Sequence, residues 1–291
     1  NQCYATNVAT PSSVMLPNDD SVTQVAVGYQ HACALMSVGE IYCWGRNNVG
    51  QIGQGESWNT STYMFTDNHS IPMLVPLEQN RTATEISAGY NFNCALLDNQ
   101  SVVCWGADGY GQIGDGSFGS ARSSPTYVNT PTNRTVQSIS VGSYHACALL
   151  DDFSVVCWGH NLYGQLGDGT SCGNNNCSAY NGRSTPVFVD FGGNATAVEV
   201  YTGQRFTCAI MDNESVYCWG RNNYGQIGNG VMYGNILSPS YVDLPGNLTP
   251  TQVSGSESPC ALFSDLSTLC WGTHSWAGNA SNSAGGVSTP R

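Results

Sequence analysis

The chain has 291 residues, a net charge of −12 and eight basic residues, all of them arginine. A protein that binds nucleic acid or an anionic membrane needs clustered cations, and these eight are scattered, so we expect neither partner. No apolar stretch approaches the ~18 residues of a membrane-spanning helix, which predicts no membrane insertion. The 34 glycines and the 10% of charged residues favour a turn-rich, all-β fold in one domain, residues 1–291.

Residues 1–23 precede five copies of one repeat, which align on the tripeptide Cys-Trp-Gly. The first cysteines of successive copies lie 61, 53, 61 and 52 residues apart. Such self-similarity indicates an array of equivalent structural modules. The copies are centred on residues 25–55, 86–116, 139–169, 198–230 and 252–280.

Each copy carries strand and turn signals in the same order. A short alternating run such as Ile139–Val141 comes first, and two apolar runs such as Cys94–Leu97 and Ser101–Trp105 follow as a predicted hairpin. A Gly-x-x-x-Gly-Gln-Ile/Leu-Gly stretch then predicts turns. We expect a fourth strand to begin at a proline, as in Pro125–Val128. Four short strands per module predict a β-propeller of five four-stranded blades.

The repeated residues also carry a family resemblance. The pattern Gly-x-x-His-x-x-Ala-Leu, followed by Tyr-x-Trp-Gly-x-Asn-x-x-Gly-Gln-Leu-Gly, resembles the regulator-of-chromosome-condensation repeat over residues 25–272. The resemblance implies a β-propeller, usually of seven blades, in which the repeated Trp, Gly and Gln positions are structural. This chain departs from the family in showing five repeats and in carrying two cysteines in each of them.

The two cysteines of every repeat lie ten positions apart. In a hairpin with a three-residue loop, such residues are opposed, with Cβ atoms ~4.5–5.5 Å apart, which is close to disulfide range. Zinc sites favour Cys-x(2–4)-Cys spacings instead. We therefore predict a disulfide in each repeat and a sixth in the Asn-rich insertion. The pairs are Cys33–Cys43, Cys94–Cys104, Cys147–Cys157, Cys208–Cys218, Cys260–Cys270 and Cys172–Cys177. Cys3 is left over as an intermolecular or free thiol, or as part of another pairing.

Oxidised cysteines indicate a compartment outside the cytosol, and the Asn-x-Ser/Thr sequons agree with it. They fall in predicted hairpin loops, linkers or the C-terminal tail, where an acceptor asparagine has to lie. We therefore predict a secreted or cell-surface glycoprotein that carries N-linked glycans. The candidate acceptors are Asn59, Asn68, Asn80, Asn99, Asn133, Asn176, Asn194, Asn213, Asn247 and Asn279.

No residue pattern selects a catalytic, cofactor or metal site. His31 and His145 occupy a repeat position that is Phe92 and Phe206 elsewhere, which favours packing over chemistry. Asp115 and Asp168 stand in Gly-Asp-Gly, where other repeats have Gln54 and Asn229, which favours a turn over calcium binding. Trp58 and Trp276 lie outside the Cys-Trp-Gly register and are the better candidates for exposed aromatic contacts.

The two ends of the chain complement one another. Thr10–Pro17 is similar to the predicted fourth strands, and Ser288–Arg291 stands where that strand of the last repeat begins. The N-terminal strand either completes the last blade within one molecule or is donated to another copy, head to tail. Closure within the molecule is favoured because its effective concentration is higher.

These observations favour a non-catalytic extracellular scaffold, structural or adhesive, such as a subunit of a surface layer or filament. A lectin-like or ligand-binding receptor module, using loops on one propeller face, is the main alternative. A polysaccharide-active enzyme stays open because a linear sequence does not reveal a pair of carboxylates held ~5–9 Å apart. Nucleotide exchange on a small GTPase, which the resemblance implies, is disfavoured because a disulfide-bonded, secreted chain would not meet that substrate.

Overall fold

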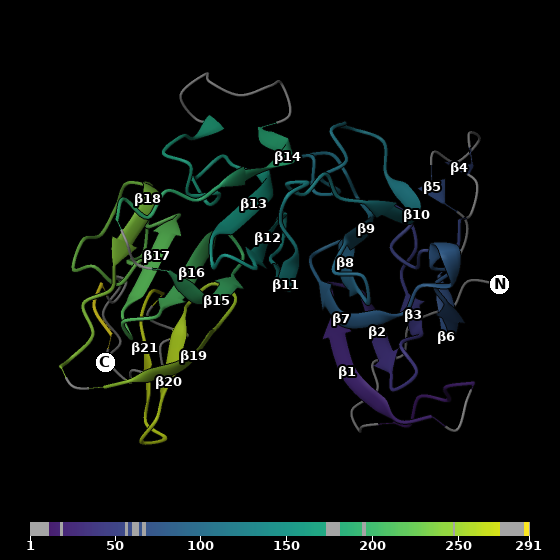
Figure 1. Cartoon of the computed structure of the whole chain (residues 1–291), viewed down its shortest axis with the longest axis horizontal. Coiled ribbons are helices and arrows are strands. Elements are labelled where there is room, and N and C mark those ends of the chain that lie inside the picture. The colour runs from purple at the N-terminus through teal and green to yellow at the C-terminus, as the bar shows by residue number, and fades with distance from the viewer. Residues whose placement is uncertain are drawn as a thin grey trace.

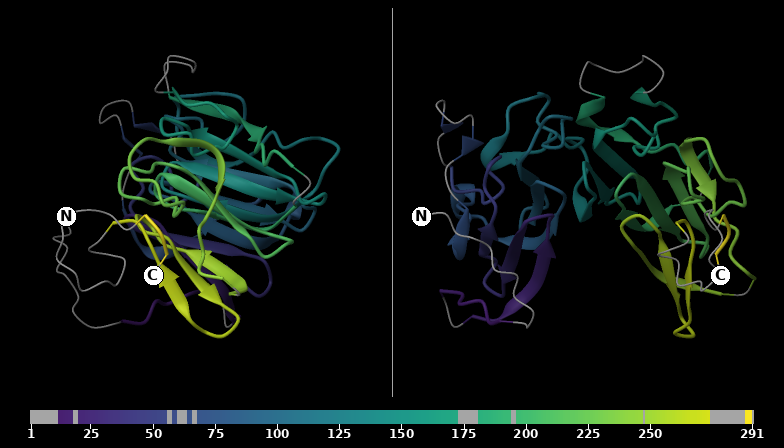
Figure 2. Two further views of the ribbon diagram at one scale, coloured as in Figure 1. Left: turned by 90° about the vertical axis from the view of Figure 1, so that its left-hand side faces the viewer. Right: turned by 180° about the vertical axis from the view of Figure 1, so that it is seen from behind.

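The computed structural model describes residues 12–17, 20–55, 58–59, 64–65, 68–172, 181–193, 196–246, 248–273 and 288–290. Five antiparallel sheets follow one another along an arc and form the blades of a β-propeller (Figure 1). The first and last blades lie at the two ends of this arc, as the view from behind also shows (Figure 2). The predicted all-β propeller fold is confirmed. No helix within the described ranges is long and apolar enough to cross a membrane.

We number the blades 1 to 5 in chain order. Blade 1 pairs as β1 (Val22–Val27), β2 (His31–Met36), β3 (Ile41–Gly45) and β6 (His69–Leu74). Blade 2 pairs as β7 (Ala83–Ala88), β8 (Phe92–Leu97), β9 (Val102–Gly106) and β10 (Arg122–Tyr127). Blade 3 pairs as β11 (Val136–Val141), β12 (His145–Leu150), β13 (Val155–His160) and β14 (Gly182–Phe188). Blade 4 pairs as β15 (Ala197–Thr202), β16 (Phe206–Met211), β17 (Val216–Gly220) and β18 (Ile236–Tyr241).

Blade 5 has three described strands, β19 (Pro250–Ser254), β20 (Cys260–Phe263) and β21 (Thr268–Cys270). Residues 288–290 lie where a fourth strand begins in other blades, because the Gly230 N–H donates to the Ser288 carbonyl (2.9 Å) as the Gly116 N–H does to Ser184 (2.8 Å). Residues 12–17 pair with no described sheet, so closure by an N-terminal strand stays a prediction. A short ribbon of β4 (Trp58–Asn59) and β5 (Met64–Phe65) and a 3-10 turn η1 (Glu78–Asn80) complete the elements.

The central hairpin of each blade holds its disulfide. In blade 3, Cys147 pairs directly with Cys157 across β12 and β13, and a three-residue loop ends at Phe153, whose positive φ of 63° closes the turn. Five disulfides at a separation of ten residues have Cα–Cα distances of 4.0–4.1 Å. Cys172 is also disulfide-bonded. Cys177 and Cys3 lie outside the described residues.

The fourth strand starts earlier than its proline, contrary to our expectation. Strand β10 begins at Arg122, and its pairing with β9 slips between Arg122 and Thr126, so that Pro125 lies within a bulge. Strands β14 and β18 slip in the same way around their prolines. A proline lacks the N–H that a regular ladder needs, but a bulge on an outer edge strand accepts it.

The apolar cores lie between blades. We call the face of a blade toward the preceding blade its leading face, and the face toward the next blade its trailing face. Each of four clusters of buried residues joins the trailing face of one blade, which includes its disulfide, to the leading face of the next. Between blades 2 and 3, for example, Cys94 and Cys104 pack in one cluster with Ile139 and Trp158.

In blades 2 to 5, the tryptophan of the Cys-Trp-Gly motif joins the blade to the one before it. The indole N–H of Trp158 donates to the main-chain carbonyl of Gln112 at 2.9 Å. Trp105, Trp219 and Trp271 make the same bond to the preceding blade at 2.9–3.0 Å. A side chain at Gly114, where φ is +76°, would place its Cβ 2.9 Å from the Trp158 ring. These Trp, Gly and Gln positions are structural.

Candidate functional site

The turns that follow Cys-Trp-Gly lie on one rim of the propeller. Two repeated side chains fix their conformation by accepting hydrogen bonds from main-chain N–H groups. In blade 3, Asn161 Oδ1 accepts from the Leu166 N–H (3.2 Å), and Gln165 Oε1 accepts from the Tyr163 N–H (2.9 Å). Gln112 and Gln226 do the same for the N–H groups of Tyr110 and Tyr224. Because the buried Gln fixes the turn, the Tyr side chain is placed on the rim.

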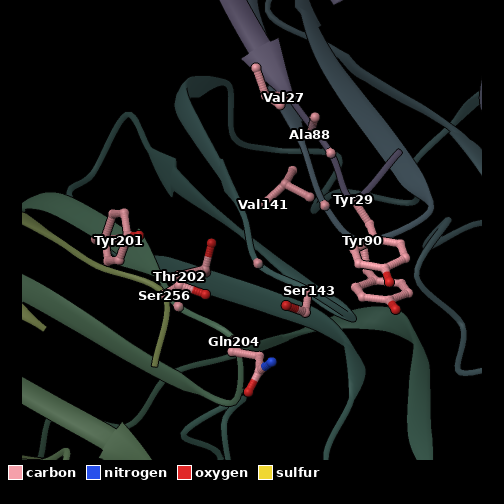
Figure 3. A pocket seen from close by; sticks show the side chains of 14 residues that line it. Val27, Tyr29, Ala88, Tyr90, Val141, Ser143, Tyr201, Thr202, Gln204 and Ser256 are labelled. Carbon is pink, nitrogen blue, oxygen red and sulfur yellow. The ribbon is translucent and has the colours of Figure 1, made fainter. Parts of the chain in front are cut away.

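A cavity of about 400 Å³ opens at the same rim (Figure 3). The ends of four inner strands and the turns after them line it, with contributions from Val27–Tyr29, Ala88–Tyr90, Val141–Ser143, Tyr201–Gln204 and Ser256. Most of these residues are small or polar. The stacked rings of Tyr29 and Tyr90 lie at one side of the cavity, and Gln204 lies at another.

A chain of aromatic rings crosses this rim from blade 1 to blade 3. We call it the tyrosine ribbon, and its members are Tyr29, Tyr90, Tyr144, Tyr110, His160 and Tyr163. Tyr29 and Tyr90 are stacked with ring centroids 4.2 Å apart, and the later neighbours are separated by 4.5–6.0 Å. Aromatic pairs in these geometries stabilise one another.

The ribbon ends at two arginines of blade 4, which we call the arginine pair. Arg205 and Arg221 place their guanidinium carbons 5.3 and 5.7 Å from the centroid of the Tyr163 ring. Arg221 also lies over Tyr224 at 5.4 Å. Both arginines line a small cleft. Such contacts place two cations over aromatic faces.

The arginine pair differs from the arginines of the outer rim, which have acidic partners. Four ion pairs join Arg81 to Asp98, Arg122 to Asp115, Arg134 to Asp152 and Arg183 to Asp168, at 2.6–3.5 Å. Arg205 and Arg221 have no carboxylate within 4 Å in the part of the chain that the structure describes, and the buried Arg221 Nε has no hydrogen-bond partner there. Burial and the charge of Arg205 also lower the pKa of His160 to about 4, so this ring is neutral.

The leading face of blade 1 forms a second surface. Val25 and Val27 on β1 are 57% and 69% exposed. The residues equivalent to Val25 in blades 2 to 5 are 1–7% exposed, because the preceding blade covers them. Trp44 is also only half-buried, and its indole N–H makes no bond to a described residue. The middle of this face, at Met36 and Tyr42, is buried, so the exposed surface is its inner edge.

Comparison with known proteins identifies the family. The profile of the RCC1-like domain matches residues 3–290. The chain belongs to the RCC1-like domain family. Its relatives include the ultraviolet-B receptor UVR8 of Arabidopsis thaliana, 28% identical over 72% of this chain and 43% of the receptor. The human E3 ubiquitin-protein ligase HERC2 is 25% identical over 94% of this chain and 5% of the ligase. The chain thus spans less than half the length of either relative.

Two solved structures share the RCC1-like fold. Human WBSCR16 has a TM-score of 0.79 at 20% identity and covers 97% of this chain and 70% of its own. Yeast RCC1 (Prp20), solved bound to Kap60, has a TM-score of 0.76 at 20% identity and covers 92% and 63%. At this identity the likeness shows the fold. The RCC1-like propeller is an interaction or ligand-binding module.

The repeated histidines lie at junctions between blades of this RCC1-like propeller. His145 Nε2 bonds Thr207 Oγ1 of the next blade at 2.9 Å, and His31 Nε2 bonds Asn93 Oδ1 at 2.8 Å. Thr207 donates its own proton to the Gln165 carbonyl, so the histidine N–H is the donor. Burial lowers the pKa of His145 to about 3 and also lowers that of His31. Both rings are buried packing groups.

The acidic turn residues make local bonds. Asp115 Oδ1 accepts from the Ser117 N–H at 2.9 Å, and Asp168 Oδ1 accepts from the Thr170 N–H at 3.0 Å. Within the described ranges, no group of three or more His, Cys, Asp or Glu side chains is placed to hold a metal. Trp276 and the side chain of Trp58 lie outside the described residues.

Five sequon asparagines have described side chains, and all five are exposed. They are Asn68, Asn80, Asn99, Asn133 and Asn213. Asn99 Oδ1 accepts from the hydroxyl of Ser101 at 2.6 Å at the tip of the blade 2 hairpin. The side chain of Asn59 and the residues Asn176, Asn194, Asn247 and Asn279 lie outside the described residues. Glycan occupancy stays a prediction.

Sequence reasoning missed the tyrosine ribbon and the arginine pair. Tyr110, Tyr163 and Tyr224 share one repeat position, directly before Gly-Gln, and this recurrence was the available signal. Tyr29 and Tyr144 stand at two different repeat positions. Only the juxtaposition of blades shows that their rings belong to one surface.

Proposed function

We propose that this RCC1-like propeller is a non-catalytic extracellular scaffold with a structural or adhesive role. The observation that carries the proposal is the presence of a disulfide in the central hairpin of every blade. The cytosol keeps thiols reduced, whereas secreted and cell-surface proteins retain such bonds. A disulfide in each repeat therefore suits a module that stays folded outside the cell.

N-linked glycans fit the same compartment. The five described sequon asparagines are exposed, and exposure is what glycan attachment requires. A scaffold of this kind presents sugars from hairpin tips and linkers while the blade junctions stay buried. The repeated histidines His31 and His145, which the sequence assigned to packing, fit the non-catalytic role because both are buried in blade junctions.

The first test is to examine native material. We expect mass spectrometry of the non-reduced protein to show five disulfides at the ten-residue spacing and glycans on exposed sequons such as Asn99 and Asn213. Electron microscopy of the same material should show the protein in surface layers or filaments. Free thiols in the hairpins, or unmodified asparagines at every sequon, would contradict the extracellular assignment.

The scaffold role includes association of copies head to tail. The exposed inner edge at Val25 and Val27 is apolar and matches residues that are buried by a neighbouring blade elsewhere. At the other end of the arc, the Cys260–Cys270 hairpin is only half-buried. A contact between two different faces propagates rather than closes. Thr268 stands on the trailing face where blades 1 to 4 have buried Val or Ile, so we expect a weaker contact than the internal junctions.

Light scattering tests this association. The unmodified protein should grow in mass with concentration, and Val25→Asp with Val27→Asp should stop growth. Leu266→Asp is the matched control, because Leu266 is an 83% exposed apolar residue on a hairpin tip. A second variant, Thr268→Arg, should block the trailing face. Mixing the two blocked variants should give dimers and nothing larger. Unmodified protein that stays monomeric at every concentration would refute the association.

Ligand binding is a second candidate function, and the tyrosine ribbon favours it. Half-exposed tyrosines combine apolar area with hydroxyl groups, which is a common composition of binding surfaces. They lie beside a cavity of about 400 Å³. A glycan array should give hits that Tyr163→Ala weakens. An array without any hit would remove this candidate and leave the scaffold role untouched.

A further inference from the structure

The arginine pair is an unbalanced charge in an acidic protein. The net charge is −12, and the described arginines of the outer rim pair with aspartates. Arg205 and Arg221 instead flank the same tyrosine ring. Two like charges beside one ring repel one another, and an anion that contacts both would offset this repulsion. The buried Nε of Arg221, which has no described partner, leaves a donor unused.

The shape of the surroundings limits what this anion can be attached to. The tyrosine ribbon leads away from Arg205 and Arg221 toward blade 1. The adjoining cavity is lined mainly by glycine, serine, threonine, glutamine and tyrosine. An apolar peptide would need pockets for its side chains, and this surface offers few. Sugar rings suit it better, because they stack their C–H faces on aromatic rings and exchange hydrogen bonds with hydroxyl groups.

We infer that the rim binds an acidic carbohydrate, with a carboxylate or sulfate between Arg205 and Arg221 and the adjoining sugars along the tyrosine ribbon. The guanidinium N–H groups donate to the anionic oxygens, which is the strongest hydrogen-bond type available here. A nucleic acid requires roughly one cation for each phosphate along its path, and besides the arginine pair this path offers only Arg46, near Tyr90, among the described residues. The inference rests on the second candidate function and names its ligand class.

Glu257 gives the site an internal check. It lines the same cleft as the arginine pair, is exposed, and makes no ion pair with either arginine at the 4 Å limit. Its charge opposes an incoming anion. Replacing Glu257 by Gln should therefore strengthen binding, whereas replacing either arginine should weaken it.

The test uses the full chain with a short oligogalacturonate, which carries a carboxylate on every sugar, and with its methyl ester, which carries none. Calorimetry at physiological salt should show binding of the acid and at least about tenfold weaker binding of the ester. Arg205→Gln and Arg221→Gln should each weaken binding of the acid by about tenfold, and Glu257→Gln should strengthen it. Arg134→Gln is the matched control, because Arg134 pairs with Asp152 away from this rim. Thermal unfolding confirms that each variant is folded.

Further arms separate the possible failures. A sulfated oligosaccharide that binds in the same arginine-dependent way would identify sulfate as the anion and support the inference. Poly-glutamate that binds as tightly as the sugar acid would overturn the carbohydrate assignment. Equal binding of acid and ester, or arginine variants that bind like the unmodified protein, would overturn the anionic site while the ligand-binding function stands. If no glycan of either kind binds, both fail.

Discussion

Blades 1 and 3 are built from the same repeat, but their leading faces differ in exposure. Ile139 of blade 3 is 5% exposed, and the equivalent Val25 of blade 1 is 57% exposed. Trp158 is buried and bonded to the main-chain carbonyl of Gln112, whereas Trp44 is half-buried and makes no such bond to any described residue. The residues are alike, so their difference in exposure comes from the preceding blade, which covers Ile139 and Trp158.

This difference shows where the stability of the propeller resides. A single blade presents two apolar faces and buries them only against its neighbours, so stability is distributed over the junctions, as in repeat proteins generally. A motif residue therefore has no fixed energetic value. The same tryptophan is a core residue at a junction and a contact residue at an end of the arc.

Replacing each tryptophan by alanine is the most severe test of this comparison. Trp158→Ala removes a fully buried ring and an inter-blade hydrogen bond, and we expect it to lower the free energy of unfolding by about 3–5 kcal/mol. Trp44→Ala should lower it by about 1 kcal/mol, because its site is already half-open. Calorimetric or denaturant unfolding of both variants measures the two values. Equal losses would show that Trp44 is as deeply packed as Trp158.

The disulfides extend the comparison to blades 3 and 5. Both bonds close loops of the same length, so replacing either pair by alanine should cost about 2–3 kcal/mol on the loop-entropy account. Their accessibility differs, since Cys147–Cys157 is buried at a junction and Cys260–Cys270 is half-buried. Thiol exchange needs access to sulfur, so dithiothreitol should reduce the blade 5 bond first. Timed alkylation and mass spectrometry would detect this order, and simultaneous reduction would contradict it.

The sequence allowed those parts of the structure to be predicted that lie within one repeat. Ten residues between cysteines fix the hairpin register, and the recurring Cys-Trp-Gly motif fixes the blades. Features that depend on a neighbour were missed or misplaced. Pro125 falls in a bulge because of how β10 meets β9, and the tyrosine ribbon gathers residues from three blades. The partners of His31 and His145 lie in the following repeat, beyond any local pattern.

The junctions themselves come in two kinds, and pH should separate them. His31 faces Asn93 and His145 faces Thr207, while Phe92 and Phe206 occupy the same position in the other blades. Each histidine donates from Nε2 and leaves Nδ1 buried without a partner among the described residues, so protonation would create an unpaired charge. Burial lowers the pKa of His145 to about 3, below its ordinary value of 6.5. Below about pH 6.5 the histidine of the unfolded chain takes up a proton that the folded chain does not. The free energy of unfolding is therefore unaffected above about pH 6.5 and decreases below it, by up to about 1.4 kcal/mol per pH unit.

The Phe92 junction shows how to remove this acid sensitivity. At the junction that Phe92 forms with the next blade, the residue that corresponds to Thr207 is Ala146. The double variant His145→Phe, Thr207→Ala therefore reproduces the pair Phe92 and Ala146, which the chain already uses. We expect this double variant to unfold at lower pH than the unmodified protein, and the two proteins to be similar near pH 7.5. Circular dichroism during acid titration provides the measurement. Unchanged acid unfolding would mean that His145 contributes nothing to it.

Replacing Asp108 should have the smallest effect on the free energy of unfolding. Blade 2 has this aspartate at a position where blades 1, 3 and 4 have asparagine. Its Oδ1 accepts from the Ile113 N–H at 3.1 Å, as an asparagine does in blades 1, 3 and 4, but its Oδ2 is buried without a described partner. Burial raises the pKa of Asp108 to about 7, so the fold favours the protonated acid. The free-energy cost of burying the ionised Asp108 carboxylate is absent below about pH 4, grows as the pH rises toward 7, and reaches its full value above pH 7. Asp108→Asn should therefore stabilise the protein by about 1–2 kcal/mol at pH 8 and by almost nothing at pH 4. Denaturant unfolding at the two pH values would show this, and an equal gain at both would assign the effect to packing rather than to charge.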